Sequence, residues 1–142
     1  MSWRRRSKGN KKIMNATPLT FDGIKFRSRL EAFTYRKLKE NGIEADYELN
    51  RYVLIPSFEY EGEKVRACTY TPDFVGKGFI IEVKGFSTDS FKIKWKMFKQ
   101  YLANKRLNID LYLPANQKKV VQVIETIKLK LNKNVTSTSK NT

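Results

Sequence analysis

The amino-acid sequence predicts one mixed α/β domain, in which a helix is followed by several strands, a second helix, a strand and a last helix. Segments with apolar residues at helical spacing alternate with short runs rich in aromatic and β-branched residues. Turn-forming residues separate these runs, as in the Gly76-Lys77-Gly78 segment. The chain has 142 residues, which is enough for one α+β domain with a mixed sheet and its own hydrophobic core.

The first helix is expected to begin near Ser28. The segment Ser28-Arg29-Leu30-Glu31 fits the capping-box pattern, in which a serine and a glutamate three residues later satisfy free backbone groups. Asn41-Gly42 ends the helical pattern. Two short strands, Ala45 to Leu49 and Arg51 to Ile55, are expected next.

Two turns then predict a pair of strands. Glu61-Gly62-Glu63 is typical of a hairpin turn and leads into an expected strand from Lys64 to Thr71. Gly76-Lys77-Gly78 leads into a second strand, from Phe79 to Lys84. Antiparallel pairing of these two strands would bring Asp73 towards Glu82.

The segment after Gly85 fits two patterns. It alternates like a strand around Lys94, but its apolar residues also follow a helical stripe, and its length favours a helix. This stripe contains Phe91, Trp95, Phe98 and Leu102. A short strand from Ile109 to Leu113 and a final amphipathic helix are expected to follow. The apolar positions of that last helix are Val120, Val121, Ile124, Ile127 and Leu131.

The ends of the chain differ in composition from the predicted domain, which covers residues 17–131. Residues 1–16 contain six basic residues and no acid, so they are expected to form a flexible basic arm, with a simple solubility tail as the alternative. Residues 132–142 are expected to be a disordered polar tail. The basic residues of the arm are Arg4, Arg5, Arg6, Lys8, Lys11 and Lys12.

The net charge points to a polyanionic partner. Lys and Arg total 29 against 14 acids, which gives a formal charge of +15 and makes nucleic acid the first candidate. No apolar run approaches the ~18 residues that span a bilayer, and no secretory signal is visible, so no membrane partner and a cytoplasmic location are expected, in a host cell if the protein is phage-encoded.

The chain contains no histidine, and Cys68 is its one cysteine. This composition excludes Ser-His triads, histidine bases and the usual zinc sites. Any hydrolytic chemistry must therefore use carboxylates, lysine, tyrosine or hydroxyl groups. Carboxylate-rich sites favour Mg²⁺ or Mn²⁺.

The strand from residue 79 to 84 combines apolar and charged residues. Because strand side chains alternate between the two faces of a sheet, one face is expected to be core and the other to carry an acid and a base. The core face would contain Phe79, Ile81 and Val83. The other face would contain Ile80, Glu82 and Lys84.

These residues predict a metal-dependent phosphodiesterase site. Asp73 and Glu82 on paired strands could hold one ion, and Val83 could add its backbone carbonyl. Lys84 would then face the scissile phosphate or the attacking water. Glu31, whose side chain leans towards the packed face of the first helix, could complete the acidic cluster.

A structural interpretation is open for each residue singly. Glu31 can be a capping-box acid paired with Ser28. Asp73 can be a turn residue after Pro72. Glu82 and Lys84 can belong to a solvated strand face.

The order of these motifs resembles that of the PD-(D/E)XK nuclease superfamily, including small phage endonucleases that resolve Holliday junctions. The resemblance rests on Ser28-Arg29-Leu30-Glu31-Ala32 at the start of a helix, on Tyr70-Thr71-Pro72-Asp73-Phe74, and on Ile80-Ile81-Glu82-Val83-Lys84-Gly85. It covers residues 20 to about 113. It implies a restriction-endonuclease-like αβββαβ core, here followed by a C-terminal helix.

The resemblance also implies roles for the site residues. Asp73 and Glu82 would bind Mg²⁺, for which Mn²⁺ would substitute, and Glu31 would serve the metal directly or through water. Lys84 would orient or activate water. The expected function is a Mg²⁺-dependent DNA endonuclease.

The expected substrate is branched DNA or a four-way junction, cut by a homodimer with two active sites. DNA contacts are expected from the basic arm and from Lys92, Lys94, Lys96 and Lys99. Two alternatives are an endonuclease subunit of a transposition or packaging complex, and a non-catalytic basic protein that binds nucleic acid.

Overall fold

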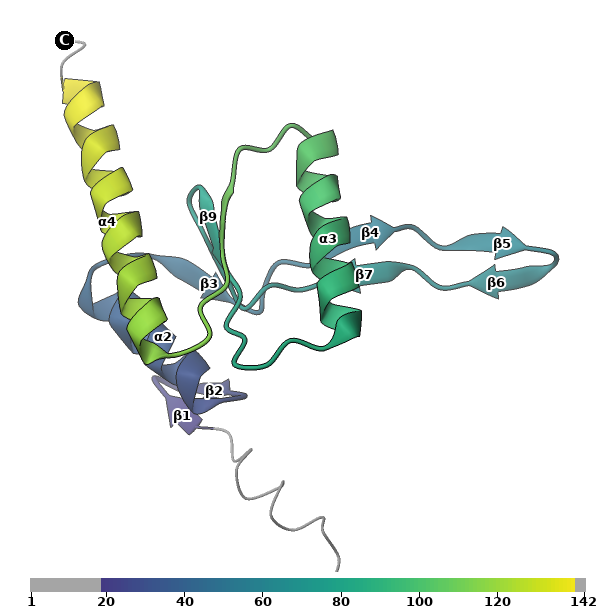
Figure 1. The fold of residues 1–142 in the computed structure, drawn as a ribbon, viewed down its shortest axis with the longest axis horizontal. Helices are drawn as coiled ribbons and strands as arrows, with labels where there is room; N and C mark the ends of the chain where they lie inside the picture. Colours follow the sequence, from purple (N-terminus) through teal and green to yellow (C-terminus); the bar gives the residue numbers. More distant parts are fainter. Residues whose placement is uncertain (1–18, 140–142) are drawn as a thin grey trace, which may run out of the picture.

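A four-stranded mixed β-sheet lies at the centre of the computed structural model, which describes the backbone of residues 19–139 and the side chains of residues 19–134. Two helices cover one face of the sheet and a third covers the other (Figure 1). The sheet order is β10 (Asp110–Tyr112), β9 (Phe79–Ile81), β8 (Phe74–Gly76) and β3 (Ala45–Tyr47). The helices are α2 (Arg29–Glu40), α3 (Asp89–Asn104) and α4 (Gln117–Ser139).

The mixed α/β class is confirmed, while the predicted basic arm cannot be compared with the structure. All six of its basic residues lie outside the described part of the chain, and they are Arg4, Arg5, Arg6, Lys8, Lys11 and Lys12. Within residues 19–139, no helix combines the length and the apolar character needed to cross a membrane.

Strand β9 is the centre of the sheet pairing. It pairs antiparallel with β8, so that Phe74 lies opposite Ile81. On its other side it pairs in parallel with β10. Helix α3 connects these two parallel strands, which need a crossover rather than a tight turn. Strand β3 completes the sheet through antiparallel pairing with β8.

The strand expected from Lys64 to Thr71 is not the partner of β9, so this expectation is wrong. The structure divides that segment into β6 (Glu63–Val65) and β7 (Cys68–Tyr70), and β7 pairs with β4 (Tyr52–Ile55). Pro72 separates β7 from β8, and because proline has no amide hydrogen to donate to a ladder, the chain changes partner there. Gly76 in β8 is required, since a Cβ at this position would lie 2.1 Å from Cζ of Phe79.

Helix α2 begins and ends where the sequence predicts. Ser28 is its N-cap, and its hydroxyl accepts a 3.1 Å hydrogen bond from the amide of Glu31. Asn41 is the C-cap, and Gly42 follows with a φ of +64°, a conformation that glycine adopts without a steric cost. The capping pattern therefore fixes the position of Glu31 in the first turn.

Helix α3 confirms the helical interpretation of the segment after Gly85. The stripe that favoured a helix is buried, and it consists of Phe91, Trp95, Phe98 and Leu102. Thr88 caps the helix by accepting a 3.1 Å hydrogen bond from the amide of Phe91. Strand β10 then lies within the segment expected from Ile109 to Leu113.

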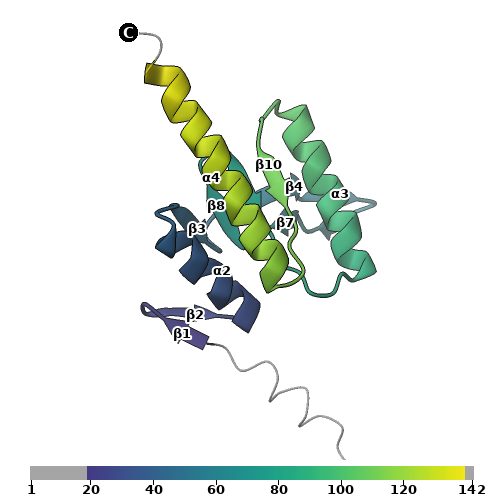
Figure 2. The same cartoon turned by 60° about the vertical axis from the view of Figure 1, so that its left-hand side comes forward.

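The two faces of β9 are both buried, which corrects the expectation of one core face and one charged face. Phe79, Ile81 and Val83 belong to a core with α2 and α4. Ile80 points the other way, into a second core with Tyr70 and the buried stripe of α3. Figure 2 shows α2 and α4 side by side on their face of the sheet. The acid after β9 therefore lies between two cores and not on a solvated face.

Helix α4 is longer than the sequence predicts. Val120, Ile124 and Ile127 are buried in the first core, whereas Val121 is exposed. The helix continues to Ser139, so the segment expected to be disordered from residue 132 is helical through this residue. Once a helix is nucleated by packed turns, each further residue adds a hydrogen bond at little cost, so a polar composition does not end it.

Residues 52–70 form a two-stranded arm that projects away from the sheet (Figure 1). Strands β4 and β7 form its base, and β5 (Phe58–Tyr60) and β6 form its tip. Glu61 and Gly62 both have positive φ, as the predicted hairpin turn requires. A second hairpin, β1 (Leu19–Phe21) with β2 (Ile24–Phe26), precedes α2, and the sequence did not predict it.

Candidate metal centre

Three acids singled out from the sequence are buried in the structure. The exposed fraction is 8% for Glu31, 8% for Asp73 and 6% for Glu82. Among the residues whose side chains are described, no other charged residue is buried. Taking a carboxylate out of water costs several kcal/mol unless charges and hydrogen bonds compensate, so these three positions need a specific explanation.

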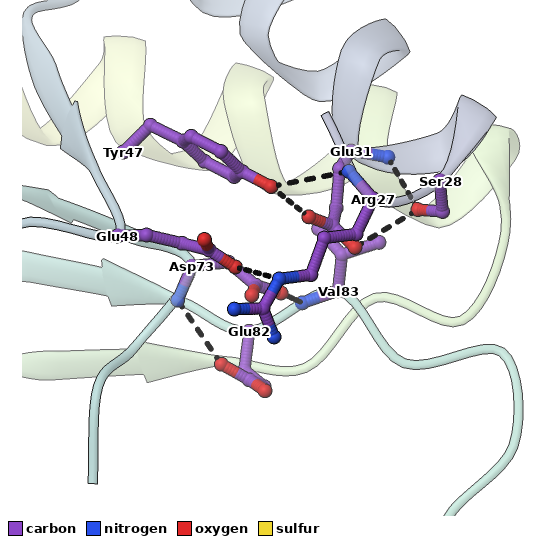
Figure 3. Close-up of polar contacts among 8 residues, drawn as sticks. All are labelled: Arg27, Ser28, Glu31, Tyr47, Glu48, Asp73, Glu82 and Val83. Atoms are coloured by element: carbon purple, nitrogen blue, oxygen red, sulfur yellow. Dashed lines mark hydrogen bonds and ion pairs between the residues drawn. The ribbon is translucent and has the colours of Figure 1, made fainter. Parts of the chain in front are cut away.

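Asp73 is fixed by hydrogen bonds to the chain that follows β9. The amide of Val83 donates a 2.8 Å hydrogen bond to Oδ2 of Asp73, and the amide of Asp73 donates a 3.1 Å hydrogen bond to Oε2 of Glu82. These reciprocal bonds continue the contact between the two chain segments beyond the ladder of β8 and β9 (Figure 3). The Asp73 carboxylate is thereby held at the open end of the hairpin formed by β8 and β9.

An acidic cluster forms around Asp73, and it contains a residue that the sequence did not reveal. Carboxylate oxygens of Glu31, Glu48 and Asp73 all lie within 4.8 Å of one another. Glu48 follows β3, and its amide donates a 2.9 Å hydrogen bond to the backbone oxygen of Asp73. The position of Glu48 depends on the pairing of β3 with β8, which local patterns do not show because β8 itself was not predicted.

Glu48 also has an unusual backbone conformation. Its φ is +47°, in the left-handed region that non-glycine residues rarely adopt. Its carboxylate forms an ion pair with Arg27, in which Oε1 of Glu48 lies 3.1 Å from Nε of Arg27. The Arg27 side chain is 78% exposed. Uncommon backbone conformations of this kind are concentrated at functional sites.

Glu31 combines its predicted capping role with membership of the cluster. Its Oε1 accepts a 3.0 Å hydrogen bond from the Ser28 hydroxyl. Its Oε2 accepts a hydrogen bond from the Tyr47 hydroxyl, which in turn accepts one from the amide of Arg27. The two interpretations of Glu31 are therefore compatible, since the cap orients the same carboxylate that faces Asp73.

Glu82 lies beside the cluster with its carboxylate turned away from it. Tyr70 donates a 2.7 Å hydrogen bond to the same Oε2 that accepts from the amide of Asp73. Figure 3 shows this carboxylate pointing away from those of Glu31 and Glu48. The structure thus brings together Glu31, Asp73 and the additional Glu48, and it places Glu82 behind them.

Lys84 approaches the site from the side of α3. It is half-buried, and its Nζ lies 4.3 Å from the centroid of the Phe91 ring. Its backbone amide donates a 3.1 Å hydrogen bond to the oxygen of Pro114, so the segment after β9 continues alongside the segment after β10. The charge of Lys84 acts to lower the pKa of Glu82.

The surroundings of Asp73 and Glu82 favour the protonated forms of these two acids. Burial raises the pKa of Asp73, and the negative charges of Glu82 and Glu31 raise it further, against the opposing hydrogen bond from Val83. Burial also raises the pKa of Glu82, although hydrogen bonds from Tyr70 and from the amide of Asp73 oppose the shift. For these two acids, the effect of burial and of neighbouring negative charge exceeds that of the hydrogen bonds they accept.

Two tyrosine hydroxyls act as donors to these acids. Burial raises the pKa of Tyr47, and the hydrogen bond to Glu31 adds to the shift. Burial likewise raises the pKa of Tyr70, together with the charge of Glu82. Both phenols therefore stay protonated near neutral pH and keep their carboxylate partners oriented.

The donor set of the cluster is suited to a hard divalent cation. Three carboxylates from different parts of the fold offer oxygen ligands, which Mg²⁺ and Mn²⁺ prefer. A cation would oppose the burial and the neighbouring negative charges that raise the pKa of Asp73. The residues present therefore fit such an ion.

The lysines expected to contact DNA lie on α3. Lys92, Lys96 and Lys99 are exposed, and Lys94 is half-buried. Nζ of Lys99 lies 6.0 Å from the centroid of Trp95, which is itself part of the second core. These lysines belong to the same helix as Phe91, whose ring contacts the ammonium of Lys84.

Comparison with known proteins gives a family but no activity. No curated protein and no solved structure matches the chain. The model of one protein family, described as "Protein of unknown function (DUF1064)", matches residues 10–129. This match includes the central sheet, the arm and every residue of the acidic cluster. The chain therefore belongs to the DUF1064 family.

Proposed function

We propose that this protein is a metal-dependent DNA endonuclease in which Glu31, Glu48 and Asp73 hold the metal. Carboxylates that are buried or half-buried, with oxygens within 4.8 Å of one another, carry this proposal. Acids this close repel one another, and their burial is unfavourable without compensating positive charge. Mg²⁺ is the proposed ion, and Mn²⁺ is expected to substitute.

The arrangement of the elements supports a restriction-endonuclease-like core. Strands β4 to β7 of the arm stand between β3 and β8 in the chain. Apart from them, the order is α2, β3, β8, β9, α3 and β10, which is αβββαβ. Because β8 and β9 are antiparallel, Asp73 before β8 and Glu82 after β9 lie at the same end of the hairpin. Lys84 follows two residues later. This placement is consistent with the resemblance to the PD-(D/E)XK nucleases.

The residues around the metal have separate proposed roles. A bound Mg²⁺ would stabilise negative charge on a phosphodiester and lower the pKa of its water. Ser28 and Tyr47 hydroxyls orient Glu31. Val83 orients Asp73 through its amide, and its carbonyl is a further proposed ligand.

Glu82 and Lys84 complete the proposed site. Glu82 holds the backbone of Asp73 and is proposed to join the ligands if it gives up the hydrogen bond from Tyr70. Lys84 is half-buried, and its ammonium is proposed to orient the attacking water or to contact the scissile phosphate. The ring of Phe91 limits where this ammonium can lie.

DNA is the proposed substrate because the chain is strongly basic. A formal charge of +15 and the exposed lysines of α3 favour contact with phosphates. Phosphate contacts position a protein without reading base sequence, so selection by DNA shape is proposed, with branched DNA or a four-way junction as substrate. Two cuts in a junction would require a homodimer.

Cleavage assays on labelled DNAs test this function. We would compare a four-way junction, a branched duplex, a linear duplex and a single strand, each with Mg²⁺ or with EDTA. Wild type should cut in Mg²⁺ alone, and Asp73→Asn should not cut while keeping its fold and its DNA affinity. Asp46→Asn is the matched control, since Asp46 is exposed on neighbouring β3 and should cut like wild type.

Other outcomes would identify the alternatives. Cleavage that needs added partner proteins would indicate a subunit of a transposition or packaging complex. Tight DNA binding without cleavage under any condition, together with no effect of Mg²⁺ on thermal stability, would indicate a non-catalytic binding protein. Cleavage by Asp73→Asn at the wild-type rate would exclude the proposed centre.

A further inference from the structure

The tip of the projecting arm is fully exposed and has an apolar face. Every residue of β5 and β6 is exposed. The register places Phe58 opposite Val65 and Tyr60 opposite Glu63, so these four side chains share one face. The exposed fractions are 47% for Phe58, 64% for Tyr60 and 36% for Val65. A two-stranded ribbon with no core of its own is only marginally stable in water, so a partner for this face is expected.

The charge of the tip is opposite to that of the rest of the molecule. Residues 58–65 contain three acids and one lysine, in a chain whose formal charge is +15. The acids are Glu59, Glu61 and Glu63. Such a tip is repelled by the phosphates of nucleic acid and attracted to a basic protein surface. The chain itself provides a surface of this kind.

The base of the arm carries a groove that is complementary to its tip. The groove has a volume of about 500 Å³ and lies between β4 and α3. Leu54, Ile55, Met97 and Tyr101 are among its apolar lining residues, and Lys105 also lines it. On α3, the exposed Lys96 lies one turn before Gln100, which lines the groove. An apolar, acidic segment is therefore complementary to this groove in polarity and in charge.

We infer that the arm is a self-association device, in which the tip of each copy docks into the groove at the base of the arm of a second copy. A two-fold axis requires that a surface on one copy meet its complement on the other, and that the same contact occur twice. Tip and groove lie at opposite ends of one arm, so two arms lying antiparallel form both contacts together. This inference does not depend on the proposed nuclease activity.

Sedimentation velocity of the full chain over a range of concentrations tests the inference. Wild type should form a dimer, and Phe58→Ser combined with Tyr60→Ser should raise the dimer Kd by about tenfold or more, because buried aromatic anchors dominate such interfaces. Both residues are exposed, so circular dichroism should show an unchanged fold. Leu129→Ser, an exposed apolar residue on α4, is the matched control and should leave the Kd unchanged.

A charge variant gives an independent measurement. Glu59→Lys, Glu61→Lys and Glu63→Lys together should weaken the dimer, and high salt should weaken the wild-type dimer. Cysteine pairing then tests the contact directly in a Cys68→Ser background. A mixture of Tyr60→Cys and Gln100→Cys chains should form a disulfide-linked heterodimer on oxidation, which can arise only between copies.

Several results would overturn the inference. These are a wild type that is monomeric at every concentration, a Kd that the tip variants do not change, and dissociation caused by Leu129→Ser, which would place the interface on α4. A tip variant that dimerises normally but binds DNA less tightly would also overturn it, by showing that the tip contacts nucleic acid.

Discussion

The Tyr70 hydroxyl donates a 2.7 Å hydrogen bond to Glu82 and holds its carboxylate facing the second core. The ring of Tyr70 is held by two aromatic contacts. Its centroid lies 6.2 Å from that of Trp95 in an edge-to-face arrangement and 4.8 Å from that of Phe98 in a tilted one. The aromatic core under α3 therefore determines where an acid of the candidate centre points.

Removal of this hydroxyl should destabilise the fold. Tyr70→Phe keeps the ring but leaves Glu82 with one hydrogen bond fewer in a buried setting, which typically costs about 1–3 kcal/mol. Urea denaturation of the two proteins measures the difference. Tyr60→Phe is the control, because Tyr60 is exposed in the arm and its hydroxyl should contribute little. Equal losses for the two variants would show that the bond to Glu82 is not important.

The pKa of Asp73 predicts a stability that falls as pH rises in metal-free protein. Its folded pKa is raised above the unfolded value, so the folded state holds the proton more tightly. The resulting stabilisation is fully present below the unfolded pKa, near 4, and is lost as pH rises through the folded pKa. One such proton gives a slope of at most about 1.4 kcal/mol per pH unit.

Thermal melting in EDTA at a series of pH values checks this prediction. Asp73→Asn should flatten the slope, because the amide cannot ionise but can still accept the hydrogen bond from Val83. Added Mg²⁺ should reverse the slope in wild type, since metal binding requires ionised ligands and becomes stronger as pH rises. A variant with the slope of wild type would assign the titration to another group.

The structure predicts that Glu48 contributes more to metal binding than Glu82 does. Glu48 lies in the acidic cluster, whereas Glu82 faces Tyr70. Glu48→Gln should weaken the binding of Mn²⁺ by at least about tenfold, since even residues that only support a ligand often have an effect of this size. Isothermal titration measures it, with the exposed Glu44→Gln as control.

The same titration on Glu82→Gln distinguishes two ligand sets. An effect smaller than that of Glu48→Gln agrees with the arrangement in the structure. A larger effect would mean that Glu82 turns towards the ion when it binds, as the resemblance to the nucleases implies.

Lys84→Ala should slow cleavage without weakening DNA binding. A single charged group that stabilises developing charge or helps proton transfer contributes about 10²-fold to a rate. The loss should persist at saturating Mg²⁺, because Lys84 is not a proposed ligand. Single-turnover kinetics check this, with the exposed Lys77→Ala as control. Full rescue by higher Mg²⁺ would instead place Lys84 in metal binding.

The elements with strong local signals were predicted correctly. Ser28 and Gly42 delimit α2 because capping groups act within a few residues of the helix end. The stripe from Phe91 to Leu102 identified α3 because a helix of 16 residues repeats its pattern several times. Glu31, Asp73 and Glu82 were singled out as site candidates, but the sequence did not predict that all three are buried.

The missed features depend on long-range contacts. Strand β8 has only three residues after Pro72, which is too short for an alternating pattern. Without β8 the pairing with β3 is not visible, and so Glu48 could not be placed beside Asp73. The orientation of Glu82 depends on Tyr70, whose ring is positioned by α3, a helix that comes later in the chain.

Glu48 has a left-handed backbone conformation, which lowers the stability of the fold, but its carboxylate belongs to the acidic cluster. A side chain with a Cβ in this conformation costs roughly 1–2 kcal/mol, a cost that glycine avoids. A screen for heat resistance alone would therefore favour Glu48→Gly and would discard a member of the candidate centre. At position 48, the substitution expected to raise stability would therefore remove a carboxylate from the acidic cluster.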